Sequence, residues 1–160
     1  MRKLLTLCFV FREDEILLGL KKRGFGSGRW NGFGGKLSPG ESIEEAAVRE
    51  TKEESGIVVR DLMPVGIHEF EFSSDLGTIL EVHVFRCQDY SGEIIETEEM
   101  EPRWFRFQDI PYADMWPDDI HWLPLLLEGK KFETRFLFGS GDTLLEWSVE
   151  EKDDLIRKTI

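Results

Sequence analysis

The sequence predicts an α+β fold built on a mixed β-sheet. Several runs of strand length alternate between apolar and polar residues, which is the pattern of strands with one buried face. One segment carries strong helix start and stop signals, and a weaker helical segment follows late in the chain. Because strands and helices do not alternate regularly, a repeated βαβ array is excluded.

The strand-like runs fall largely into hairpins separated by turn residues. The first two runs are joined by a charged turn at residues 12–15, and a later pair turns around residues 74–77. The last pair flanks a glycine-containing turn at residues 139–142. We expect strands at Leu4–Phe11, Ile16–Lys22, Val65–Phe72, Thr78–Cys87, Arg103–Phe107, Phe132–Phe138 and Thr143–Val149.

The main helix has well-marked boundaries. Ser42, followed three residues later by Glu45, forms a capping box. Gly56 stands where a helix commonly ends, because glycine adopts the left-handed conformation at little cost. A second, short helix is expected to end near Leu127, although Pro124 lies inside it.

Length and charge limit the classes of protein. The 160 residues are typical of one domain, which we expect to span residues 1–160. The formal charge is −12, and with 41% hydrophobic and 12% aromatic residues the chain is not a disordered acidic tail. Negative charge disfavours binding to nucleic-acid polymers and anionic membranes. An anionic small molecule would require a local basic patch, helix N-termini or metal ions.

No segment predicts secretion or membrane insertion. The apolar run near the start is short, the charged residues 12–15 follow at once, and no cleavage site follows. Cys8 and Cys87 each lie in an apolar alternating run, so we expect two reduced core thiols, with a structural disulfide as the alternative. We therefore expect a cytoplasmic monomer, with the mitochondrial matrix and the nucleus as further compartments.

A basic, glycine-rich segment precedes the main helix, whose charge is opposite. Residues 21–36 contain five Lys or Arg and no acidic residue, whereas the helix is rich in glutamate. Glu50, Glu53 and Glu54 stand at i, i+3 and i+4, so their carboxylates share one helical face. Mg²⁺ prefers carboxylates together with water and phosphate oxygens, and it would offset their repulsion. The alternative is a solvated acidic face.

The spacing from the glycine segment through the helix resembles the Nudix box, G-x5-E-x7-R-E-U-x-E-E-x-G-U, in which U is a bulky aliphatic residue. The matching residues are Gly35, Glu41, Arg49, Glu50, Glu53, Glu54, Gly56 and Ile57. The one departure is Thr51 at the first U position, where we expect the methyl group to face the core. The chain lacks a P-loop, a GxGxxG fingerprint and an HExxH motif, so His68, His83 and His121 are interpreted as ordinary residues rather than metal ligands.

Residues outside the box are similar to the vertebrate MutT-homologue family of oxidised purine nucleoside triphosphatases. The similarity is carried by Lys21–Gly26, Gly28–Lys36 and Met115–Asp119, and it extends from Leu5 to about Val149. It implies the Nudix fold, a mixed β-sheet sandwiched by helices with a catalytic loop-helix-loop. It also implies hydrolysis of 8-oxo-dGTP and 2-oxo-dATP to the monophosphate and pyrophosphate by water attack at the β-phosphorus, which sanitises the nucleotide pool.

The resemblance also implies roles for individual residues. The implied ligands for Mg²⁺, or for Mn²⁺ as a substitute, are the backbone carbonyl of Gly34 and the carboxylates of Glu50, Glu53, Glu54 and Glu99. The implied catalytic residues are Arg49, Glu53 and Glu54, with Arg49 holding the glutamates in register. The implied substrate-binding residues are Thr6, Lys21, Phe25, Asn31, Phe70, Trp116, Asp118 and Asp119, of which Lys21 would contact phosphate. Further positions of the same pocket match Leu7, Leu80 and Trp122, and Leu80 departs from the methionine of a family member.

The residues themselves leave several of these roles open. Asn31 could offer its amide to a base edge or could form a turn with positive φ. Trp116 could stack on a purine or belong to the core or a lid. Asp118 and Asp119 could cap the following helix. If they instead face a buried base, one pKa would rise, and a shared proton would let the pair read both oxidised guanine and oxidised adenine.

Two other functions are compatible with parts of the sequence. The first is a Nudix hydrolase of another capped nucleoside diphosphate, such as a nucleotide sugar or an mRNA cap, and the purine-pocket residues disfavour it. The second is a non-catalytic binding module on a degenerate Nudix fold. The intact box arginine and glutamates disfavour that alternative, because degenerate boxes usually lose the metal-binding acids.

Overall fold

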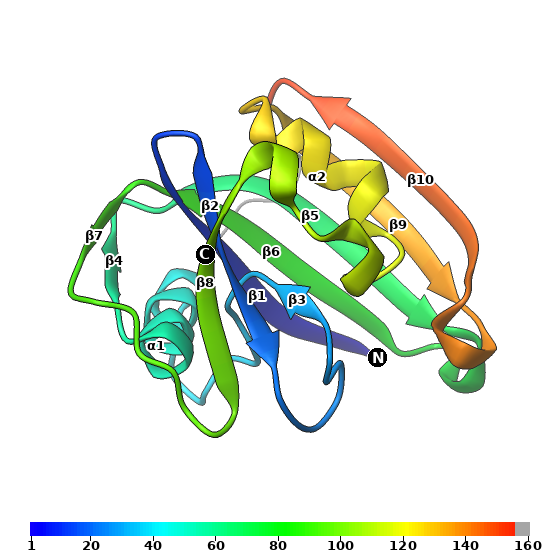
Figure 1. Ribbon diagram of the computed structural model, residues 1–160. Helices are drawn as coiled ribbons and strands as arrows, with labels where there is room; N and C mark the ends of the chain where they lie inside the picture. The colour runs from blue at the N-terminus through cyan, green and yellow to red at the C-terminus, as the bar shows by residue number, and fades with distance from the viewer. Residues whose placement is uncertain (156–160) are drawn as a thin grey trace.

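The computed structural model describes residues 1–155 and has a long mixed β-sheet at its centre (Figure 1). The strand order is β10-β9-β5-β6-β1-β2-β3, and β8 pairs with β2. The strands of this sheet are β1 Arg2–Arg12, β2 Glu15–Lys21, β3 Trp30–Asn31, β5 Met63–Phe72, β6 Ile79–Cys87, β8 Met100–Arg106, β9 Lys131–Phe138 and β10 Leu144–Lys152. A separate two-stranded sheet joins β4 Val58–Arg60 to β7 Asp89–Ser91.

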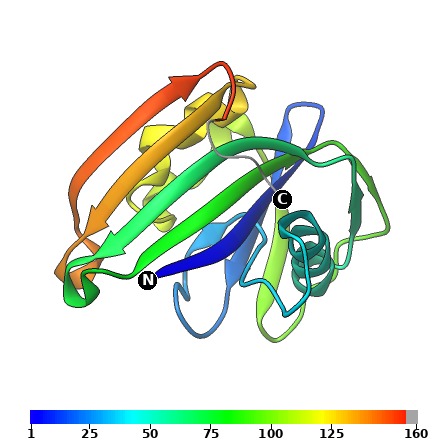
Figure 2. The same ribbon diagram turned by 180° about the vertical axis from the view of Figure 1, so that it is seen from behind.

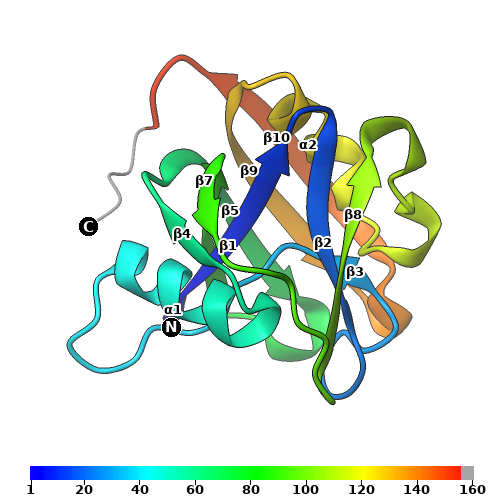
Figure 3. The same cartoon turned by 60° about the vertical axis from the view of Figure 1, so that its left-hand side comes forward.

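Two α-helices, α1 Ile43–Ser55 and α2 Asp119–Leu127, lie on opposite sides of the sheet (Figure 3). From behind, α1 lies in front of the β1 end of the sheet, and none of the described residues forms a helix over β9 and β10 on that side (Figure 2). Short 3₁₀ turns are found at η1 Ser73–Asp75, η2 Phe107–Asp109, η3 Tyr112–Asp114 and η4 Ser140–Asp142.

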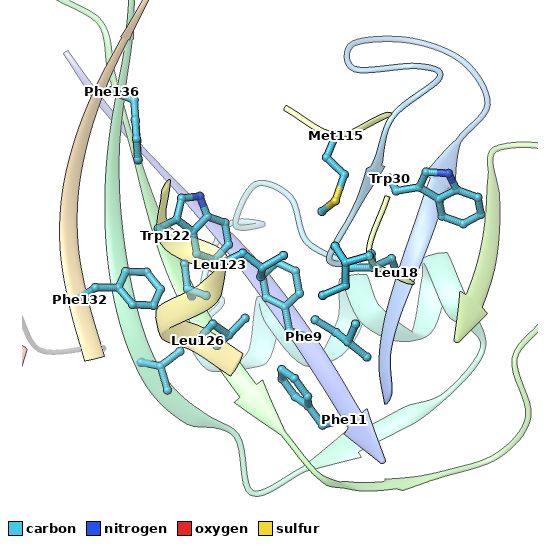
Figure 4. Close-up of a cluster of buried hydrophobic side chains, with 14 of the residues drawn as sticks. Phe9, Phe11, Leu18, Trp30, Met115, Trp122, Leu123, Leu126, Phe132 and Phe136 are labelled. Atoms are coloured by element: carbon cyan, nitrogen blue, oxygen red, sulfur yellow. The ribbon is translucent and has the colours of Figure 1, made fainter. Parts of the chain in front are cut away.

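Strand β1 separates two hydrophobic clusters. Phe9 belongs to the cluster on the α2 side, where its ring centroid lies 5.7 Å from that of Trp122 (Figure 4). On the same side Trp122 also packs against Phe132, with centroids 5.4 Å apart. Cys8 and Val10, the neighbours of Phe9, belong to the cluster on the α1 side. Because both faces of β1 are buried, its sequence is a continuous apolar run rather than a strict alternation.

Two parallel pairings bring together side chains that are far apart in sequence. Strand β1 runs parallel to β6, which places Leu5 opposite Val82. Strand β5 runs parallel to β9, which places Phe72 opposite Phe138. Neighbouring residues on paired strands point to the same face of a sheet. These pairings therefore gather apolar and aromatic side chains on the α2 side, where the candidate site lies.

The predicted elements are present, and the α+β class with a mixed sheet is confirmed. Helix α1 has the predicted capping box at Ser42, and Gly56 ends it with φ +88°. Helix α2 tolerates Pro124, which removes one internal hydrogen-bond donor. Strands β3, β4 and β7 were not predicted, because two or three residues are too few for a periodic pattern.

The expectations on membranes, cysteines and chain extent have different outcomes. No helix within residues 1–155 is long and apolar enough to cross a membrane. Cys8 and Cys87 are buried free thiols, so the alternative of a disulfide is wrong. Burial raises the pKa of Cys8 to about 12, which keeps this thiol protonated. Residues 156–160, which would complete the predicted domain, lie outside the described residues, and the domain boundary stays a prediction.

Candidate active site

Helix α1 carries three glutamates of the box, and Arg49 connects two of them, Glu50 and Glu53, to Glu41 before the helix. Its Nε and Nη2 atoms donate to the two oxygens of Glu41 at 2.6 and 2.9 Å. Its Nη1 donates to Glu50 at 2.9 Å and to Glu53 at 3.3 Å. This hydrogen bonding lowers the pKa of Glu41 to about 2, so Glu41 stays ionised. Arg49 thus links the start of the helix to two of its acidic side chains, as expected for a positioning residue.

The glycine segment packs closely between β1 and α1. A Cβ atom at Gly34 would lie 1.7 Å from the backbone oxygen of Thr6, and one at Gly35 would lie 2.8 Å from the carboxyl group of Glu50. The backbone N–H of Gly34 donates to Oε1 of Glu54 at 2.9 Å. Only glycine fits at position 34, because the backbone of Thr6 lies in the way, whereas a side chain at position 35 would displace the carboxyl group of Glu50.

Without a bound cation, burial makes ionisation of the glutamates on α1 unfavourable. It raises the pKa of Glu54 to about 7, although the Gly34 N–H partly offsets the shift, and it raises the pKa of Glu50. Thr51 is fully buried, and its hydroxyl donates to the carbonyl of Ala47; that its methyl group faces the core stays a prediction. Partly desolvated carboxylates beside a tight glycine backbone fit the oxygen-only preference of Mg²⁺ or Mn²⁺.

The remaining predicted metal ligands are less closely gathered. The carboxylate of Glu53 is mostly exposed and pairs with Arg49. Glu99 is also exposed, its carboxylate lies 3.2 Å from Arg23, and no described contact joins it to the glutamates of α1. Within residues 1–155, no three acidic, histidine or cysteine side chains are already grouped to hold a metal ion. The assignment of Glu99 therefore stays a prediction.

A pocket of about 250 Å³ lies on the α2 side of the sheet, and Glu54 is the residue of α1 that lines it. All eight predicted substrate-binding residues line it: Thr6, Lys21, Phe25, Asn31, Phe70, Trp116, Asp118 and Asp119. Gly34 and Glu54 line the same pocket, as do Leu7, Leu80 and Trp122. The structure therefore brings the predicted base-binding residues and part of the predicted metal site into one continuous space.

Two adjacent aspartates are buried in the wall of the pocket. Asp118 is 2% exposed and Asp119 is 3% exposed. Asp118 stands before α2 but makes no side-chain capping bond, and instead it accepts a hydrogen bond from Nε1 of Trp122 at 2.8 Å. The capping interpretation is therefore wrong for Asp118. Oδ2 of Asp119 is buried without a hydrogen-bond partner.

Burial controls the ionisation of this pair. It raises the pKa of Asp118, and it raises the pKa of Asp119 well above its ordinary value with a further contribution from the charge of Asp118. Two carboxyl groups this close in an apolar site do not both ionise readily. At least one of them can therefore donate a hydrogen bond to a ligand near neutral pH.

Aromatic rings also line the pocket. Trp116 lies with its ring centroid 5.2 Å from that of Phe25, and it meets Phe138 edge-on at 5.6 Å.

Asn31 lies on the short strand β3 without a positive φ, so the turn interpretation of this residue is wrong. Its side-chain oxygen accepts a hydrogen bond from the Gly32 N–H at 2.8 Å. Flat aromatic surfaces beside polar groups suit a planar heterocycle.

Sequence reasoning missed several residues of the pocket. Arg29, Phe72, Met100 and Phe138 also line it. Phe72 could have been found, because it follows Phe70 by two residues on one strand and points to the same face. Met100 and Phe138 reach the pocket only through pairing between distant strands, which no local pattern reveals.

A larger hollow of about 410 Å³ lies over β5, β9 and β10, away from the box glutamates. Three of its charged lining residues are already engaged with one another, since both Arg2 and Arg135 form ion pairs with Glu69. The smaller pocket is therefore the stronger candidate, because it holds buried, incompletely paired acids next to the box glycines.

The comparison with protein families matches the description "NUDIX domain" over residues 1–126 of this chain. The chain belongs to the NUDIX family. The matched range covers the whole NUDIX box, from Gly35 to Ile57, and both aspartates of the pocket. The resemblance inferred from the box spacing is thereby confirmed.

Curated relatives narrow the similarity within the NUDIX family. The oxidized purine nucleoside triphosphate hydrolase of Mus musculus is 50% identical over 151 residues, covering 94% of this chain and 96% of the relative. The protein of the same name from Danio rerio is 48% identical over 153 residues, covering 96% of this chain and 97% of the relative. The resemblance to the vertebrate MutT homologues is therefore confirmed along most of the chain.

The NUDIX fold is also confirmed by a solved structure. The mutator MutT protein from Bacillus halodurans superposes with a TM-score of 0.83 at 25% sequence identity. The superposition covers 92% of this chain and 97% of the MutT chain. The mixed sheet between two helices is therefore the arrangement found in MutT.

Proposed function

We propose that this protein hydrolyses oxidised purine nucleoside triphosphates, 8-oxo-dGTP and 2-oxo-dATP among them, to the monophosphate and pyrophosphate. The observation that carries the proposal is the buried pair Asp118 and Asp119, with an unpartnered oxygen on Asp119, in the same pocket as Glu54. The names of the mouse and zebrafish relatives support the same substrate class.

The aspartates would recognise the base by placing their shared proton so that their donor and acceptor groups complement those of the base. An oxidised purine presents a changed set of donors and acceptors on its edge. A pair of carboxyl groups that holds one proton can donate from one group and accept at the other, and it can exchange the two roles. Asn31 would add an amide donor and acceptor, while Trp116 and Phe25 would enclose the ring faces.

The phosphates would extend from the base towards α1. Lys21 lines the pocket at the end of β2 and would contact a phosphate oxygen. Oε1 of Glu54 is held by the Gly34 N–H, which leaves Oε2 for a metal ion or a water molecule. When bound, Mg²⁺ held by Glu50, Glu53, Glu54 and the Gly34 carbonyl would neutralise developing phosphate charge and acidify the attacking water.

Arg49 and the glycine segment would keep this arrangement rigid. The two-oxygen contact between Arg49 and Glu41 fixes the guanidinium group, which in turn restrains Glu50 and Glu53. Fixed polar groups stabilise a transition state without reorganising during the reaction. The proposal places this chemistry on free nucleotides and in a monomeric protein, in agreement with the net charge of −12, which disfavours nucleic-acid polymers.

The deciding assay measures pyrophosphate release from 8-oxo-dGTP, 2-oxo-dATP and dGTP, each with Mg²⁺ and with EDTA. We expect both oxidised nucleotides to give a higher kcat/KM than dGTP, and activity to disappear in EDTA. A nucleotide sugar and a cap dinucleotide belong in the same experiment, with their hydrolysis followed by chromatography of the nucleotide products, because neither releases pyrophosphate. Faster hydrolysis of either would contradict the proposed substrate class while keeping the NUDIX chemistry. Binding of nucleotide without turnover would identify a binding module instead.

A further inference from the structure

Arg29 is a pocket residue that the proposed chemistry does not use. Its guanidinium carbon lies 4.1 Å from the centroid of the Trp116 ring, which is within the range of a cation–π contact. The same guanidinium donates from Nη1 to Oδ2 of Asp142 at 3.0 Å. The side chain of Arg29 is 26% exposed and that of Asp142 is 38% exposed, so the contact is partly shielded from water.

The partner of Arg29 comes from a distant part of the chain. Asp142 ends the η4 turn between β9 and β10, and it adopts a φ of +59°. A positive φ is uncommon outside glycine, although aspartate tolerates it better than most residues. The turn also contains Gly141 with φ +66°. In this backbone conformation, the carboxylate of Asp142 accepts the hydrogen bond from Arg29.

The backbone of Arg29 is also fixed by hydrogen bonds within its own loop. Its carbonyl accepts a hydrogen bond from the Lys21 N–H at 3.2 Å, and its N–H donates to Gly26 at 3.3 Å. Both Arg29 and Trp116 line the pocket, whereas Asp142 does not. The ion pair thus crosses from the loop after β2 to the β9–β10 turn, with the indole of Trp116 against the shared guanidinium.

We propose that Arg29 and Asp142 form a clamp that positions Trp116 for stacking on the purine base. Because the guanidinium lies against one face of the indole, it keeps that face from the base and restrains the ring from turning away. The clamp rests on the proposed base-binding function of this pocket. It makes Arg29 a positioning residue, and it gives the β9–β10 turn a role in the affinity for the base.

The electrostatic effect of Arg29 on Asp119 also indicates that Arg29 lies near the base-recognition site. Burial and the charge of Asp118 raise the pKa of Asp119, and the positive charge of Arg29 acts weakly in the opposite direction. Arg29 is therefore close enough to the base-recognition site to affect it electrostatically. The competing interpretation is that Arg29, as a member of the basic segment, contacts a phosphate group directly.

The test compares ligands that share a base and differ in phosphate. The Kd values of metal-free protein would be measured for 8-oxo-deoxyguanosine and for its 5′-monophosphate, using Arg29→Gln, Asp142→Asn and the double variant. We expect each single substitution to raise both Kd values by the same factor, roughly three- to tenfold. We expect the double variant to show no further loss, because both changes break one clamp. The effect should appear in KM for 8-oxo-dGTP with kcat changed less than twofold.

The chain offers a matched control at another tryptophan. The Cζ atom of Arg12 lies 4.1 Å from the ring centroid of Trp104, and Arg12 pairs with Glu15 at 2.9 Å, so it has the same two kinds of contact. Arg12 does not line the pocket. Arg12→Gln should leave both Kd values unchanged, which separates a general loss of stability from a specific loss of base binding. Unfolding temperatures of all variants would be recorded in parallel.

Three results would contradict the clamp. A loss confined to the monophosphate would make Arg29 a phosphate ligand. Unchanged Kd values in both single variants, with normal wild-type binding, would overturn the clamp alone. A wild-type protein that binds neither ligand would overturn the proposed function and the clamp's role in base binding together. Asp142→Asn reports on the clamp without altering the pocket lining, so it decides the case if Arg29→Gln does not fold.

Discussion

The indole Nε1 of Trp122 donates a hydrogen bond to the carboxylate of Asp118 at 2.8 Å, between two residues that are almost fully buried. This contact fixes one oxygen of Asp118 as an acceptor. The neighbouring Asp119 has a raised pKa and a buried oxygen with no partner. The pair is therefore asymmetric before any ligand binds, because one oxygen of Asp118 has a protein donor, whereas Oδ2 of Asp119 has no partner.

The first prediction follows from this asymmetry. Asp118→Asn keeps an oxygen acceptor for Trp122 but prevents the exchange of a proton with Asp119. We expect the ratio of kcat/KM for 8-oxo-dGTP to that for 2-oxo-dATP to change by roughly five- to a hundredfold, since an unsatisfied buried partner costs about 1–3 kcal/mol. The matched control is Asp114→Asn, at an exposed position of the same segment. An unchanged ratio in Asp118→Asn would contradict proton sharing.

Asp119→Asn tests the other half of the pair. Its unpartnered oxygen makes it the group that we expect to contact every base directly. The substitution should therefore reduce kcat/KM for both oxidised substrates, rather than shift the ratio between them. The Tm measured beside these rates should rise or stay unchanged at neutral pH, because burial disfavours the ionised form that the substitution removes. A lower Tm with unchanged rates would indicate a purely structural pair.

A second prediction concerns the stacking surface. Trp116→Ala should weaken binding of 8-oxo-dGMP by about 1–3 kcal/mol, the usual contribution of one base stacked on an aromatic side chain. Trp147→Ala is the control, because Trp147 is half-exposed and packs on His121 outside the pocket. Titration calorimetry on both variants would measure the difference. An unchanged Kd for Trp116→Ala would return this residue to a role in the core or in a lid.

The local parts of the site were predictable from the sequence, because their signals are short-range. The capping box at Ser42 and the glycine at position 56 fix both ends of α1, and the helical spacing then places Glu50, Glu53 and Glu54 on one face. The glycine segment was also evident in the sequence, but the close packing that requires glycine there was not. A Cβ at Gly34 would strike the backbone of Thr6, which is 28 residues earlier in the chain.

The non-local parts of the pocket were not predictable from residue patterns. Phe138 reaches the pocket because β9 runs parallel to β5, and Arg29 meets Asp142 across 113 residues of sequence. The capping interpretation of Asp118 failed for a similar reason. An aspartate before a helix normally accepts hydrogen bonds from the helix N–H groups. Here the carboxylate of Asp118 instead accepts from the indole N–H of Trp122, one turn later.

A third prediction tests the connecting role of Arg49. Arg49→Lys keeps the charge but cannot reach both oxygens of Glu41 together with Glu50 and Glu53. We expect kcat to fall roughly 10- to 100-fold, the usual loss when a group that orients metal ligands is altered. Arg60→Lys, which also removes a surface guanidinium pair, is the control and should leave kcat unchanged. Equal activity of Arg49→Lys and wild type would contradict the positioning role.

The last prediction concerns Glu54, whose burial has opposite consequences for catalysis and for stability. Glu54→Gln keeps the volume of the side chain and an oxygen that can accept from the Gly34 N–H. It removes the charge that a metal ion requires, so turnover of 8-oxo-dGTP with Mg²⁺ should be lost, while 8-oxo-dGMP should still bind in EDTA. Near-normal turnover would contradict the box-metal mechanism.

The stability of the same variant should depend on pH with a definite sign. In metal-free wild type, burial raises the pKa of Glu54 from 4.5 to about 7, so the folded protein holds a proton that the unfolded chain releases. That contribution is fully present below pH 4.5 and is lost as the pH rises through 7. Glutamine stays neutral throughout. In EDTA, the variant and wild type should therefore have similar unfolding free energies near pH 4, and the variant should be more stable by about 3 kcal/mol at pH 8. Denaturant unfolding at both pH values would measure this difference, and adding Mg²⁺ at pH 8 should stabilise wild type but not the variant.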